Sequence, residues 1–146
     1  MRVMPHTEEL PYALYRAAQV REFDRLAIEE YGIPGAELME RAGSRALQLL
    51  REVWPRARDI CVVCGVGNNG GDGYVLARLA LQGGLRPRLL QLGDPAKLQG
   101  DALRMAEAWR SAGGRVETFR GLPRECDLII DAILGTGLER PVTFST

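Results

Sequence analysis

The sequence predicts an α/β protein with a Rossmann-like, doubly wound parallel sheet in a three-layer αβα arrangement, preceded by two N-terminal helices. Short apolar runs alternate with helical segments of about ten residues from position 60 onward. The first run leads into a glycine-rich segment, residues 65–73, and the last leads into another, residues 135–137. This alternation is typical of βαβ units, whose right-handed crossovers build a parallel sheet.

Two helices are expected before the sheet, over residues 12–31 and 36–53. Gly32 ends the first helix and Pro55 ends the second. Gly43 lies inside the second helix, where the lack of a side chain would allow another element to approach closely. Apolar residues of the first segment recur at spacings of three and four and therefore share one face: Val20, Phe23, Ala27 and Tyr31.

Four strands and two further helices are expected after residue 59. The helices cover residues 73–82 and 101–112, and each ends at a pair of glycines. Asp94 followed by Pro95 has the pattern of a helix N-cap. Continuous apolar or β-branched content predicts strands over residues 60–64, 86–92, 115–119 and 127–133.

The usual order of a doubly wound sheet places the first strand beside the fourth, where the winding reverses. Ligands bind in the crevice at the carboxyl ends of these two strands. In this chain those ends are the segments that follow Cys64 and Ile133, and both are rich in glycine. We therefore expect the ligand site between them.

Composition limits the class of protein. The 146 residues fit one domain, and 19 basic residues balance 19 acidic ones. A neutral chain is not expected to bind nucleic acid or an anionic membrane surface. Three cysteines are too few for a disulfide framework, and no apolar run reaches the ~18 residues of a membrane span. No secretory signal is recognisable at the N-terminus, so we expect a cytoplasmic protein.

The segment 65–73 carries the strongest chemical signal. It follows a strand and opens a helix, and glycines there usually serve close approach of the backbone to a ligand, with a phosphate at the helix N-terminus. Asn68, Asn69 and Asp72 add polar side chains that resemble ligands in their own right. A tight turn without any ligand is the plain structural alternative.

Gly65, Gly67 and Gly70 also fit the dinucleotide fingerprint of dehydrogenases. That fingerprint requires a carboxylate at the end of the second strand, about 20 residues on, to bind the ribose. Asp94 comes too late and has the pattern of a cap, so a dehydrogenase is disfavoured. A Walker A loop is excluded because no Lys-Ser or Lys-Thr follows the glycines.

Asp131 stands near the end of the fourth predicted strand, where a carboxylate is costly unless it is paired or bound to a metal. It can be a helix cap or a satisfied acceptor. Together with the Asn69 side chain from the neighbouring loop, it can also form an oxygen site for a cation. Cys61 and Cys64 have the spacing of a metal motif, but residues three apart in a strand face opposite sides, so core packing is expected.

Four stretches, residues 18–24, 37–43, 64–73 and 131–137, closely resemble the NAD(P)H-hydrate epimerase family, the YjeF N-terminal domain. The most specific is the string Asn-Asn-Gly-Gly-Asp-Gly. The resemblance implies interconversion of the R and S epimers of hydrated NAD(P)H, with a dehydratase, fused or separate, that uses the S form. It implies a potassium ion held by Asn69 and Asp131. It also implies substrate contacts from two groups of residues: Asn68, Asn69, Gly70, Gly71 and Asp72, and Gly135, Thr136, Gly137, Leu138, Glu139, Arg140 and Pro141.

The family pattern continues beyond the second loop into an Asp-x-Pro-Ser-Gly segment that the 146 residues do not include. We therefore expect residues 1–146 to form such a domain, incomplete at its C-terminus. The catalytic group stays open: Asp72 is the candidate within these loops, and the aspartate of the further segment is the preferred one. The alternative is a non-catalytic Rossmann-like module for nucleotide binding or dimerisation. A homo-oligomer is expected in either case.

Overall fold

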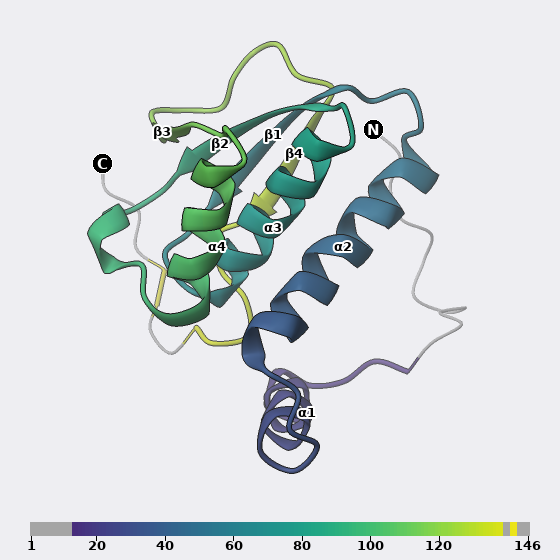
Figure 1. The fold of residues 1–146 in the computed structure, drawn as a ribbon, viewed down its shortest axis with the longest axis vertical. Coiled ribbons are helices and arrows are strands. Elements are labelled where there is room, and N and C mark those ends of the chain that lie inside the picture. Colours follow the sequence, from purple (N-terminus) through teal and green to yellow (C-terminus); the bar gives the residue numbers. More distant parts are fainter. Residues whose placement is uncertain (1–12, 139–140, 143–146) are drawn as a thin grey trace.

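The computed structural model describes residues 13–138, 141 and 142 (Figure 1). Every predicted strand is present, with ends that agree with the prediction to within one residue. The elements in chain order are α1 (Ala17–Glu29), α2 (Gly35–Val53), β1 (Asp59–Cys64), α3 (Asn68–Gln82), β2 (Arg86–Gln91), the 3-10 helix η2 (Pro95–Lys97), α4 (Gly100–Ser111), β3 (Val116–Thr118) and β4 (Leu128–Ala132).

The four strands form one parallel sheet in the order β3-β2-β1-β4. Cys64, the last residue of β1, pairs with Gln91 on one side and with Ala132 on the other. The predicted fold class is confirmed, as is the prediction that the first strand lies beside the fourth. The winding reverses at β1, so the segments after β1 and β4 leave the sheet next to each other.

β1 is buried on both faces, which explains its uninterrupted apolar sequence. Ile60, Val62 and Cys64 point into the core beneath the helices, whereas Cys61 belongs to a smaller cluster on the other face. Both cysteines are fully buried free thiols, and burial raises the pKa of each. Core packing is therefore confirmed for this pair.

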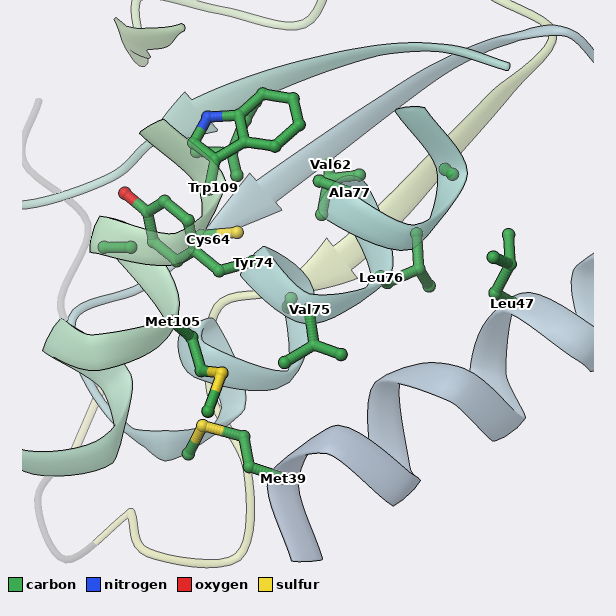
Figure 2. Packing of buried hydrophobic residues seen from close by; sticks show 14 of the residues in the cluster. Met39, Leu47, Val62, Cys64, Tyr74, Val75, Leu76, Ala77, Met105 and Trp109 are labelled. Carbon is green, nitrogen blue, oxygen red and sulfur yellow. The ribbon is translucent and has the colours of Figure 1, made fainter. Parts of the chain in front are cut away.

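Three helices cover the sheet face that carries Val62 (Figure 2). α3 packs on the strands, with α2 and α4 on either side of it. Gly43 of α2 permits this packing, because a Cβ there would lie 2.5 Å from Cγ1 of Val75. The smaller cluster on the opposite face is covered by loop residues instead: Phe119, Cys126 and Ile133.

α1 stands apart from this core and has no buried residue (Figure 1). It is shorter than the predicted helix, because the backbone at Arg16 is extended and its N–H donates to the Gln19 side chain at 2.9 Å. The apolar face predicted for α1 is not buried, and its Phe23 ring meets the Tyr15 ring edge to face at 5.0 Å. Among the described helices, none is long and apolar enough to cross a bilayer.

Candidate functional site

The segments that follow β1 and β4 are joined to each other at the carboxyl edge of the sheet. The Gly65 N–H donates to the carbonyl of Ala132 at 3.0 Å. The side-chain amide of Asn69 donates to the carbonyl of Leu134, also at 3.0 Å. The two glycine-rich segments that were expected to border the ligand site are therefore joined by direct hydrogen bonds.

α3 begins at Asn68, five residues before the predicted start. The prediction was wrong here because Asn and Gly are poor helix formers in a helix interior. In a first turn they are tolerated, and the Gly71 N–H already donates to the carbonyl of Gly67 at 3.1 Å. The N–H groups before Gly71 have no acceptor within the helix, and no side chain caps them. Such a terminus suits an anion such as a phosphate.

Internal packing accounts for most glycines of this segment. A Cβ at Gly65 would lie 2.1 Å from the Ile133 carbonyl oxygen, and one at Gly70 would lie 2.0 Å from the Gly65 carbonyl oxygen. Gly71 is confined by side-chain and backbone atoms of α2 and α4, and Gly73 is confined by side chains of β1 and β4. Only Gly67 has no atom within 4 Å of an added Cβ, so it alone offers an open backbone surface to a ligand.

Asp72 lies in the second turn of α3 and is half-buried. Burial, with a smaller contribution from the nearby charge of Asp24, raises the pKa of its carboxyl to about 6. Asp24 comes from α1, whose Arg21 side chain donates to the carbonyl of Thr136 in the second loop. Sequence reasoning gave α1 no role at the site. The available signal was that residues 18–24 are one of the stretches that carry the family resemblance, and that Arg21 and Asp24, three residues apart, share a helix face.

Asp131 and Asn69 supply side-chain oxygens at the same edge. Asp131 is exposed, and its Oδ1 accepts the N–H of Ile133 at 3.0 Å, so it is a satisfied acceptor with a second oxygen left over. The side-chain nitrogen of Asn69 donates to the Leu134 carbonyl, and its Oδ1 has no hydrogen-bond partner among the described residues. Two oxygens from the two joined loops have the donor chemistry of a hard-cation site.

The second loop is open to solvent. Gly135, Thr136, Gly137 and Leu138 are all exposed, as is Pro141. A Cβ on Gly135 would lie 3.2 Å from the Cβ of Asn69, which keeps this loop against the start of α3. The predicted contacts at residues 139 and 140, Glu139 and Arg140, lie outside the described residues.

The tip of β2 differs from that of a dehydrogenase. Gln91 ends the strand, and its side chain is turned into the core, with 2% of the residue exposed. Asp94 accepts the N–H of Ala96 at 2.9 Å and caps η2, as predicted. Neither side chain is placed as a ribose carboxylate at the strand end, which agrees with the sequence argument against a dehydrogenase.

The family model for the YjeF-related protein N-terminus matches residues 35–145, most of the chain. The chain belongs to this family. The crystal structure of the yeast protein YNL200c shares the α/β fold of this chain, with a TM-score of 0.79. The two are 22% identical, and the match covers 90% of this chain and 60% of the yeast one.

Curated relatives of this YjeF-type chain carry related names. It is 42% identical over 132 residues to the bifunctional NAD(P)H-hydrate repair enzyme Nnr of Escherichia coli, covering 90% of this chain and 26% of that protein. It is 38% identical over 136 residues to the NAD(P)H-hydrate epimerase of Rhodobacter capsulatus, covering 85% of this chain and 62% of that protein. The chain thus spans about a quarter of the bifunctional relative and about three fifths of the epimerase.

Proposed function

We propose that this chain supplies the epimerase site for hydrated NAD(P)H, converting the R epimer into the S epimer that a dehydratase uses. We also propose that residues 1–146 belong to one domain of this type. The names of the E. coli and R. capsulatus relatives support the substrate and a dehydratase partner. The observation that carries the proposal is the pair of joined loops, with the uncapped N-terminus of α3 between them.

The first turn of α3 would bind the substrate's pyrophosphate. The free N–H groups at this terminus and the open side of Gly67 give an anion a direct approach to the backbone. The exposed loop from Gly135 to Leu138 would close on the other side of the dinucleotide. In this arrangement the hydrated nicotinamide ring would lie beside the carboxyl group of Asp72.

Epimerisation requires the hydroxyl group at the hydrated ring carbon to leave one face and return on the other. A protonated Asp72 would donate its proton to that hydroxyl, which departs as water while the ring nitrogen's electron pair forms a C=N bond. Water then adds to the opposite face and returns a proton to the carboxylate, so the step balances. A carboxyl group with a pKa of about 6 is populated in both forms near neutral pH, as this exchange needs.

Potassium belongs to the proposal as a structural ligand. Asn69 and Asp131 would hold it through Oδ1 of the amide and the second carboxylate oxygen, with backbone carbonyls completing the site. Among the described residues, no three or more His, Cys, Asp or Glu gather as a metal cluster. A bound monovalent ion is a weak Lewis acid and would supply charge that orients the phosphates and the two loops.

Titration separates this function from the alternatives. The protein is titrated with NADPH hydrate, with NADPH and with NADP⁺ under the same conditions. An epimerase site binds the hydrate most tightly. Equal affinity for the hydrate and for NADPH would instead support the non-catalytic nucleotide-binding module, and tight binding of NADP⁺ alone would support a dehydrogenase. The expected homo-oligomer stays a prediction that sedimentation of the same samples checks.

A further inference from the structure

Gln91 is a fully satisfied polar side chain in the core of the described residues. It is 2% exposed, at the end of β2. Its Oε1 accepts the hydroxyl of Tyr74 at 2.6 Å. Its Nε2 donates to the carbonyls of Cys64 at 3.0 Å and of Leu92 at 2.9 Å. Both amide hydrogens and the amide oxygen therefore have partners, and the amide can lie in one orientation only.

Tyr74 provides the other half of this pair. It is fully buried on α3, directly after Gly73. Burial raises the pKa of its hydroxyl to about 12, so the group keeps its proton and acts as a donor at every working pH. Figure 2 shows its ring in the core beside Cys64. The two side chains thus connect the start of α3 with the ends of β1 and β2.

The Cys64 carbonyl is where these bonds converge. It accepts the Leu92 N–H at 2.8 Å in addition to the Gln91 amide. The next residue, Gly65, begins the segment that bonds to Ala132 and forms the candidate site. A purely apolar core could hold the same elements together, but it would not fix the direction of this carbonyl.

We infer that Tyr74 and Gln91 are positioning residues of the candidate site, which hold the end of β1 so that the glycine-rich segment meets its ligand in a single geometry. The inference rests on the proposed function for the identity of the ligand. Neither side chain touches the ligand, because both are buried beneath the segment that does. Their removal should loosen the segment locally and weaken binding more than it weakens the fold.

The test compares Tyr74→Phe with the control Trp109→Phe. Trp109 is also buried, and its Nε1 donates to the Arg115 carbonyl at 3.0 Å, away from the carboxyl edge. The control loses ring volume as well as a donor, so its melting temperature should fall at least as far. Gln91→Met, which removes the amide at similar volume, is the second variant if Tyr74→Phe does not fold.

Two readouts are measured on all variants: amide hydrogen exchange at Gly65 and Leu92, and the affinity for NADPH hydrate. We expect Tyr74→Phe to speed exchange and weaken hydrate binding, each by about tenfold, as loss of one hydrogen bond allows. Trp109→Phe should change neither by more than about twofold. The inference is overturned if exchange at Gly65 is unchanged in Tyr74→Phe, or if the control has the same effect. A wild-type protein that does not bind the hydrate refutes the proposed function instead, because the exchange result does not depend on ligand.

Discussion

Replacing Gly65 by alanine tests the contact that joins the two loops. The added Cβ would lie 2.1 Å from the Ile133 carbonyl oxygen, whereas carbon and oxygen approach no closer than about 3.3 Å without strain. The obstacle is backbone, so no side chain can rotate away. The two loops must therefore separate by about 1 Å, the difference between these distances. This separation would stretch the hydrogen bond from the Gly65 N–H to the Ala132 carbonyl, which is 3.0 Å long.

The expected cost has two parts. Overpacking of this kind costs about 1–3 kcal/mol, and loss of one backbone hydrogen bond adds about 1 kcal/mol. The free energy of unfolding should therefore fall by about 2–4 kcal/mol. For a chain of 146 residues this corresponds to a fall in melting temperature of about 10 °C.

Gly67→Ala is the matched control. Its Cβ would meet nothing within 4 Å, and its φ of −94° suits any residue. Unfolding in urea should show this variant unchanged, or more stable by about 0.5 kcal/mol through lower entropy of the unfolded chain. Its hydrate affinity should fall, because the open side of Gly67 faces the ligand. A Gly65→Ala protein within about 0.5 kcal/mol of wild type would refute the packing argument.

Three further predictions concern charge and reactivity. Because the pKa of Asp72 rises from 3.8 to about 6 on folding, the folded state binds the extra proton, and stability falls as pH rises between these values. In urea unfolding, Asp72→Asn should therefore be more stable than wild type at pH 7, by up to about 2 kcal/mol, and equally stable at pH 3. A stability difference that stays constant across this pH range would contradict the raised pKa of Asp72. Potassium should raise the wild-type melting temperature above that in sodium at equal ionic strength, and Asn69→Ala or Asp131→Asn should remove the gain; a wild type indifferent to the two ions excludes the cation site. A thiol-specific disulfide reagent should label half-exposed Cys126 first in the native protein, whereas Cys61 and Cys64 react only on unfolding; equal native rates for all three contradict the described core.

The sheet could be predicted from the sequence because its determinants are local. β1 is buried on both faces, so its apolar run has no polar interruption between Ile60 and Cys64. The glycine pairs after α3 and α4 mark where those helices end. Given alternating strands and helices, the right-handed crossover rule leaves few strand orders, and the observed one is the commonest among them.

The details of the site depended on contacts that periodicity does not encode. The start of α3 at Asn68 was missed because its glycines are required by neighbours distant in sequence, such as Met39 beside Gly71. The approach of α1 was missed for the same reason, since Arg21 and Thr136 meet only through the tertiary fold. The raised pKa of Asp72 arises from its burial and from Asp24, and neither is visible in the local sequence.

The measurement that tests the proposed function most directly is recovery of NADPH from purified R-hydrate by a dehydratase specific for the S epimer. The dehydratase alone leaves the R-hydrate to its slow spontaneous epimerisation. Adding this protein should accelerate the appearance of NADPH in proportion to its concentration, and Asp72→Asn should be slower by about 100-fold or more, as loss of a general acid–base group predicts. Recovery at the uncatalysed rate, whatever the amount of a folded, hydrate-binding protein, would contradict the claim.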